Sequence, residues 1–276
     1  MTRRPARLAR AVSCALAAGT LMTTAACSGD GGTDASRARG VTAEQAAEQQ
    51  RQTPSPTATL TTDGARMALI TEADIEDDWT QVRDTEAENW HDSLLIGTVD
   101  VSDFLTAKAQ AASCQRLINS LFDDDLLGRP SGASALRGFE QGDSRLLYQV
   151  ASYERTDPED SLHWMAKLPE KCDQFTVTAD DGGQRTVQVI DIPLPDVGDA
   201  REGLRVTVRG STGGENATLT LDVAAVRVGD DAITVTAGGL DGDENDSVEQ
   251  AVKQGTPRLK DVLAGRTPTP NPSQIE

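Results

Sequence analysis

Basic side chains are the first shortage in this sequence. Lysine and arginine number 26 against 44 aspartates and glutamates, which gives a formal net charge of -18 at pH 7. A chain this acidic repels nucleic-acid phosphates and anionic lipid headgroups, so we expect no nucleic-acid partner. Long apolar runs are also missing beyond the N-terminal region, where no stretch reaches the roughly 20 residues that a membrane-spanning helix needs.

Signatures of catalysis and of metal binding are missing as well. The sequence contains neither G-x-S-x-G nor S-x-x-K, two motifs of serine nucleophiles. It has two histidines, His91 and His163, and they are not at ligand spacing. The acidic run 241–246 begins like a calcium loop, but Asp246 stands where glycine is needed and Val252 where a bidentate glutamate is needed. We therefore expect no catalytic residue, no metal site, no cofactor and no enzymatic activity.

The N-terminal region has the pattern of an export signal. Residues 1–10 are basic and residues 11–23 are apolar over a length typical of a signal peptide. The following Thr24-Ala25-Ala26-Cys27 resembles the lipobox of bacterial lipoproteins, although Thr24 stands where the motif usually has an aliphatic residue. The resemblance implies a signal peptide over 1–26 and a lipid on Cys27. The alternative is ordinary signal cleavage before Cys27, which would leave a free thiol.

Composition divides the rest of the chain into three parts. Residues 27–64 are rich in Ser, Thr, Pro and Gln and offer no apolar stripe, which predicts a disordered tether. Residues 65–265 have the size of a single domain. Residues 266–276 predict a disordered tail. With a lipid on Cys27, the domain would lie outside the cytoplasm, held at the outer face of the cell membrane.

The periodicity of the domain predicts helices and antiparallel strands. Helices are expected over 71–79 and 102–122, from Asp157, and from Asp246, with the last one broken at Pro257. The remaining apolar segments alternate with turn sequences such as Gly142-Asp143, as in hairpins. The predicted strands cover 135–141, 144–153, 173–179, 184–194, 203–210, 216–228 and 232–238. Because hairpins make antiparallel sheets and the helices have one apolar face each, we predict an α+β fold, an antiparallel sheet covered by helices.

Two cysteines remain inside the predicted domain, Cys114 and Cys172. In an exported protein such a pair is expected to form a disulfide, which would join two helices to the sheet. Two buried free thiols are the alternative.

The order of these features resembles a group of actinobacterial extracellular domains. Leu69-Ile70-Thr71 before Ala73-Asp74, then a cysteine after each of two helical stretches, matches the pattern of the family of the mycobacterial receptor kinase PknH sensor domain. The resemblance covers roughly residues 65–265. It implies an antiparallel sheet with helices, a deep cleft, and a role in sensing or binding.

Our functional hypothesis is a membrane-tethered, non-enzymatic domain that binds a small ligand or an envelope protein. Aromatic residues are only 3% of the chain, and Tyr148, Tyr153 and Trp164 cluster on one strand-helix unit, so they are candidates to line a cleft; core packing is the alternative for each. An envelope assembly module without a small ligand is the second hypothesis, and an exported hydrolase is the third.

Overall fold

The computed structural model describes most of the predicted domain. The described residues are 59–75, 78–96, 99–100, 102–154, 157–179, 182–212, 215–240, 242 and 244–269. The predicted signal peptide, Cys27, most of the tether and the end of the tail lie outside them. Helix α1 (Thr62–Ala68) begins before residue 65, and Leu60 ahead of it is buried, so packing starts inside the segment assigned to the tether.

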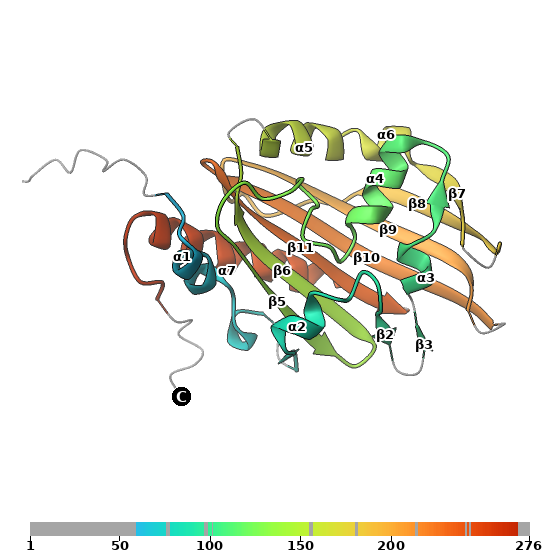
Figure 1. The fold of residues 1–276 in the computed structure, drawn as a ribbon, viewed down its shortest axis with the longest axis horizontal. Coiled ribbons are helices and arrows are strands. Elements are labelled where there is room, and N and C mark those ends of the chain that lie inside the picture. Colours follow the sequence, from blue (N-terminus) through green and yellow to red (C-terminus); the bar gives the residue numbers. More distant parts are fainter. Residues whose placement is uncertain are drawn as a thin grey trace, which may run out of the picture. The chain divides into compact units, whose positions relative to one another are not determined.

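A nine-stranded antiparallel sheet forms the centre of the fold (Figure 1), in the order β1-β5-β6-β11-β10-β9-β8-β7-β4. Four consecutive strands, β8 to β11, follow one another by hairpins or short connections and are neighbours in the sheet. The strands are β1 (Thr80–Gln81), β4 (Lys108–Ala109), β5 (Ser134–Gln141), β6 (Ser144–Ser152), β7 (Gln174–Thr178), β8 (Gln184–Asp191), β9 (Ala200–Thr212), β10 (Glu215–Val228) and β11 (Asp231–Leu240). A separate ribbon pairs β2 (Leu95–Ile96) with β3 (Val99–Asp100).

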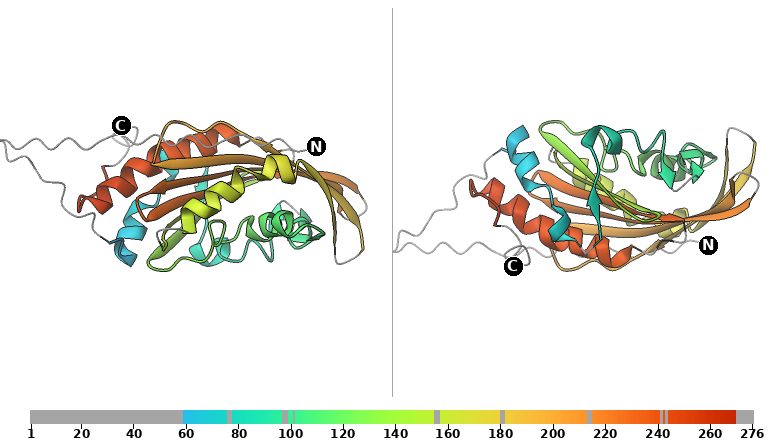
Figure 2. Two further views of the ribbon diagram at one scale, coloured as in Figure 1. Left: turned by 90° about the horizontal axis from the view of Figure 1, so that it is seen from above. Right: turned by 90° about the horizontal axis from the view of Figure 1, so that it is seen from below.

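Helices cover both faces of this sheet (Figure 2). On one face lie α1 and the long α7 (Asn245–Leu263), which packs on β10 and β11. The opposite face, called the helical face below, carries the shorter helices α2 (Asp84–Ala87), α3 (Ser102–Leu105), α4 (Ala112–Ser120), α5 (Asp157–Met165) and α6 (Leu168–Lys171). The predicted α+β class is confirmed.

Strand alternation divides the apolar residues between two cores. In β10, Leu221 and Val223 point into the core of the helical face, while Ala224 and Val226 point toward α7. Successive side chains of a strand face opposite sides of the sheet, so one strand supplies both cores. The same rule places Leu147 and Tyr148 of β6 on opposite faces.

Three predicted helices differ from the structure. The segment expected as one helix over 102–122 is α3, β4 and α4, because the Gln115 side chain accepts from Ala109 N–H (2.6 Å) and holds β4 as a partner of β7. In 71–79 the described helical turn is only Glu72–Asp74 (η1). Helix α7 continues through Pro257, and the Thr256 hydroxyl donates to the Val252 carbonyl beside it.

The structure contains the disulfide between Cys114 of α4 and Cys172 after α6. Both residues are buried, and their Cα atoms are 5.8 Å apart. The bridge closes a loop with a sequence separation of 58, which the chain-entropy model converts to about 4 kcal/mol of stability. It joins two helices of the helical face, as expected from the sequence.

Candidate functional site

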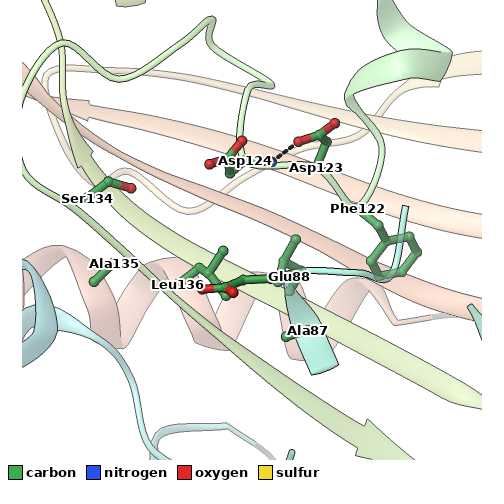
Figure 3. Close-up of a pocket in the computed structure, with 9 residues that line it drawn as sticks. Ala87, Glu88, Phe122, Asp123, Asp124, Ser134, Ala135 and Leu136 are labelled. Carbon is green, nitrogen blue, oxygen red and sulfur yellow. Dashed lines mark hydrogen bonds between the residues drawn. The ribbon is translucent and has the colours of Figure 1, made fainter. Parts of the chain in front are cut away.

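A pocket of about 370 Å³ opens on the helical face (Figure 3). It lies between α2, the segment that follows α4, and the neighbouring strands β5 and β6. Its lining combines apolar side chains with three carboxyl groups and one hydroxyl. The residues are Ala87, Glu88, Phe122, Asp123, Asp124, Ser134, Ala135, Leu136 and Leu147.

The floor of the pocket is apolar because the strands of the sheet supply it. Leu147 is buried in the core of the helical face, and Leu136 on the adjacent strand is half-buried against it. Phe122 packs edge-on against Trp90 with 5.9 Å between ring centroids. Its backbone has φ of +55°, a left-handed conformation that bulky residues rarely adopt. This packing holds the turn that carries the acidic residues.

A buried glutamine fixes that turn to the sheet. Gln149 donates through its amide nitrogen to the Asp124 carbonyl (2.9 Å) and to the Ser134 hydroxyl (3.3 Å). Its amide oxygen accepts from the Thr234 hydroxyl (3.1 Å). Gln149 is 2% exposed, so these bonds are shielded from water. The backbone of the pocket rim is therefore preorganised.

The rim of the pocket carries neighbouring carboxyl groups, and burial together with their negative charges raises the pKa values of Asp124 and of Asp125 beside it. Burial is the main cause that raises the pKa of Asp124, and its hydrogen bond to Asp123 and that residue's charge add to it. Burial also raises the pKa of Asp125, with the charge of Asp124 as the next cause. Arg129 acts in the opposite direction on both carboxyl groups, but less strongly. Such an environment favours proton uptake or a bound cation.

Tyr148, one of the three predicted cleft residues, lies on the other face of the sheet. It is fully buried in the core beneath α7, and its hydroxyl has no hydrogen-bond partner among the described residues. Desolvation raises the pKa of its phenol. Tyr148 therefore cannot share one cleft with Tyr153, which lies on the helical face.

Tyr153 and Trp164 belong to the core of the helical face, beside the pocket but outside its lining. The Arg116 guanidinium stacks over the Trp164 ring at 3.9 Å and donates to the Ser161 hydroxyl. The Tyr153 hydroxyl is buried without a partner among the described residues, and its pKa is raised by burial and then by Asp124 and Asp125. A ligand contact of Tyr153 or Trp164 stays a prediction.

The residues of the pocket were not candidates in the sequence. A signal was present in the run Leu121-Phe122-Asp123-Asp124-Asp125, where three acids follow an apolar pair. Runs of acidic residues usually face solvent, so this run did not indicate a site. Glu88, the third acidic residue of the rim, is more than thirty positions away from Asp123 in the sequence. Only the antiparallel pairing of β5 with β6 brings the apolar floor under both segments.

Two other hollows, of about 480 and 450 Å³, flank Ile192 and Pro193. Their basic residues are already paired, since Arg205 binds Asp222 (2.7 Å) and Arg201 binds Asp196 (2.8 Å). Searched over the described residues alone, the structure has no cluster of three His, Cys, Asp or Glu side chains placed to hold a metal ion. Nor does any helix in that part of the chain have the length and apolarity to cross a membrane.

Comparison with known proteins includes two solved structures to which this chain is similar. No family model and no curated protein matches the sequence. The chain is similar to the extracellular domain of PknH from Mycobacterium tuberculosis, at 10% identity and a TM-score of 0.41, over 76% of this chain and 100% of that one. It is also similar to an uncharacterized protein of Mycobacterium smegmatis, the Rv0999 ortholog, at 15% identity and a TM-score of 0.34, over 76% and 97% of the two chains. At these scores we argue function from the residues of this protein alone.

Proposed function

We propose that this protein is an extracytoplasmic lipoprotein whose α+β domain binds a ligand or partner without catalysis. The observation that carries the proposal is the pocket with an apolar floor and an acidic rim, held in place by buried Gln149. Concave sites that combine apolar side chains with a few placed polar groups are where proteins bind small molecules. The lipobox-like Thr24-Ala25-Ala26-Cys27 supports attachment to the outer face of the membrane.

Paired native and denaturing mass spectrometry of the full mature chain, purified from an exporting host, tests the proposal. We expect an additional mass in the native spectrum that disappears on denaturation. The denatured mass should also contain a diacylglyceryl group on Cys27 and one disulfide. A native spectrum without any adduct, in a host that processes the lipobox, would count against small-ligand binding.

A second candidate function, an envelope interaction module, is favoured by a bare surface on the α7 side of the sheet. Helix α7 packs on β10 and β11, and no described helix lies over β7, β8 and β9 on that side. The outward side chains there are polar, exposed or half-buried, and rich in threonine. They are Thr176, Thr178, Thr186, Gln188, Thr207, Arg209, Thr218 and Thr220.

Substitution on this surface separates the two functions. Thr186→Arg/Thr207→Arg should disrupt a protein contact across the surface while any adduct in the pocket is retained. Chemical crosslinking in intact cells, compared between the native chain and this variant, measures the difference. Identical crosslinks from both proteins would remove the interaction surface from consideration.

A further inference from the structure

Strand β5 has an uncovered margin beside the pocket. Strand β1 pairs with β5 only at Phe139 and Glu140, and Val82 after it donates its N–H to the Gly138 carbonyl (2.9 Å). The chain then leaves the sheet as α2. Among the described residues, no strand pairs with residues 134–137 on the side away from β6. This margin of β5 is called the open edge below.

Gly138 is the position at which the covering chain turns away from β5. A Cβ atom there would lie 2.5 Å from the Cβ atom of Ala87 and 2.7 Å from the Trp90 ring. Helix α2 and the turn after it can therefore pack on the helical face of the strand only because residue 138 is glycine. The packing carries the chain away from the margin, and residues 134–137 stay half-buried where Gly138 and Phe139 are buried.

The main-chain groups of β5 alternate in direction. The Ser152 N–H donates to the Ala133 carbonyl (2.8 Å), so the odd-numbered residues direct their N–H and C=O groups toward β6. The bond from Val82 to Gly138 shows that the even-numbered residues direct theirs to the other side. At the open edge, Ser134 and Leu136 therefore present donors and acceptors that no described strand receives. Groups of this kind pair readily with another extended chain.

The pocket lies directly beside the open edge, because Ser134, Ala135 and Leu136 belong to its lining (Figure 3). Residues directly opposite each other on paired strands share one face of the sheet. A residue opposite Leu136 would therefore place its side chain on the helical face, over the apolar floor that includes Leu147. A residue opposite Ser134 would lie near Asp124, since Gln149 binds both the Ser134 hydroxyl and the Asp124 carbonyl.

Charge decides between a second copy and a different partner. Two copies that paired through their open edges about a two-fold axis would have their helical faces on the same side of the joined sheet. The carboxyl groups of Glu88, Asp123 and Asp124 would then approach those of the other copy, in a chain whose formal net charge is -18. Like charges disfavour such a contact, whereas a basic side chain would be attracted to the same place.

From these observations we propose, resting on the function proposed above, that the open edge binds an extended segment of a partner protein as an added antiparallel strand, which reads apolar-any-basic. The apolar residue would exchange two main-chain hydrogen bonds with Leu136 and place its side chain in the pocket, whose volume of about 370 Å³ admits one side chain. The basic residue would pair with Ser134 in the same way. The added strand would continue the line of β1 along β5.

The test is calorimetric titration of the full mature chain with the capped peptide Thr-Thr-Leu-Thr-Lys-Thr-Thr. An N-methyl group on the leucine removes the N–H that would face Leu136, whereas an N-methyl group on the following threonine removes one that would face away from β5. We expect the first methylation to weaken binding at least tenfold and the second to change it less than threefold.

A pair of protein variants tests the same contact from the other side. Leu136→Lys should weaken binding of the unmethylated peptide at least tenfold, because the lysine fills the hollow and places a charge on the edge. Ile190→Lys is the matched control, since it adds the same charge at an exposed apolar residue of β8 and should leave binding unchanged. The methylated peptides keep the test decisive if Leu136→Lys does not fold.

The other outcomes overturn the inference. Equal effects of the two methylations, or no binding of the unmethylated peptide, would exclude strand addition at this edge. A dimer of the chain in sedimentation, dissociated by the peptide, would assign the edge to a second copy instead. A native small-molecule adduct on a chain that binds no peptide would overturn the inference while leaving the proposed binding function in place.

Discussion

Gly255 of α7 lies directly against Tyr148 of β6. A Cβ atom at position 255 would lie 1.9 Å from the Tyr148 hydroxyl oxygen, so the helix can lie this close only because residue 255 is glycine. The hydroxyl itself has no partner among the described residues. Tyr148, which the sequence predicted as a cleft residue, is packed beneath α7 by this contact.

A double-mutant cycle tests this contact. Gly255→Ala should destabilise the fold by about 2 kcal/mol through overpacking. Tyr148→Phe should be neutral or stabilising, because it removes a buried hydroxyl without a partner. In the double variant it should recover part of the loss, since the ring carbon Cζ would still lie 2.8 Å from the added Cβ. Urea unfolding measures all three. Strictly additive effects would mean that the two residues do not press on each other.

Asp231 is the residue that makes stability depend on pH most directly. Burial raises the pKa of its carboxyl to about 6, a hydrogen bond with Ser152 opposes the shift, and the charge of Asp230 adds to it. One carboxyl oxygen, Oδ1, has no partner among the described residues. The folded protein therefore holds this proton at a higher pH than the unfolded chain does.

The sign of the effect follows from this difference. The unfolded chain releases the Asp231 proton near pH 4, whereas the folded protein keeps it until about pH 6. Between these two pH values, the contribution of Asp231 to the free energy of unfolding therefore declines as the pH rises. Asp231→Asn should be stabilising by about 1 kcal/mol at pH 7.5, a figure reduced for solvent screening, and nearly neutral at pH 4. Urea unfolding of both proteins across this range measures the difference. A gap that stays constant with pH would contradict the assignment to Asp231.

At the scale of elements, the Leu69–Asp74 motif has a structural role. Arg258 of α7 donates to the Leu69 carbonyl (3.0 Å) and pairs with the buried carboxylate of Asp74 (3.4 Å). Asp74 also accepts from the Thr71 backbone N–H (2.8 Å), and Arg137 of β5 donates to the Ile70 carbonyl (2.8 Å). The motif thus fastens the start of the domain to its last helix.

The contribution of the Arg258–Asp74 ion pair to stability can be measured. Arg258→Met should destabilise the protein by about 3 kcal/mol, because it leaves Asp74 buried without its cation. Amide hydrogen exchange over residues 69–75 should accelerate more than in the strands. Arg266→Met is the control, since its pair with Asp261 is largely exposed and should contribute under about 1 kcal/mol. Equal losses in both variants would show that the buried pair has no special role.

At the scale of the whole molecule, the sheet presents two different faces. The helical face carries the acidic pocket, and the threonine-rich surface of β7, β8 and β9 lies on the opposite side. The proposed attachment has a direct test. Cys27→Ala should move the protein from the detergent phase to the aqueous phase after export, and globomycin should block maturation of the native chain. A mature native form without acyl mass would exclude lipidation.

The sequence by itself determined the fold class, most strands and the disulfide. Strand alternation and turn residues act over a few positions, so segments such as 184–194 and 216–228 were predicted close to β8 and β10. Two cysteines inside one domain leave a single internal pairing.

Tertiary structure alone decided how the segments meet. The expected helix over 102–122 gave way to α3, β4 and α4 because β7 offered a free edge and Gln115 held the strand against it. Tyr148 of β6 and Tyr153, which directly follows β6, were separated because odd- and even-numbered residues of an extended segment point to opposite faces of the sheet. The acidic pocket exists because Glu88 and Asp124, far apart in the chain, line one hollow over a floor from β5 and β6. Such contacts depend on packing between segments far apart in the chain, which local periodicity does not encode.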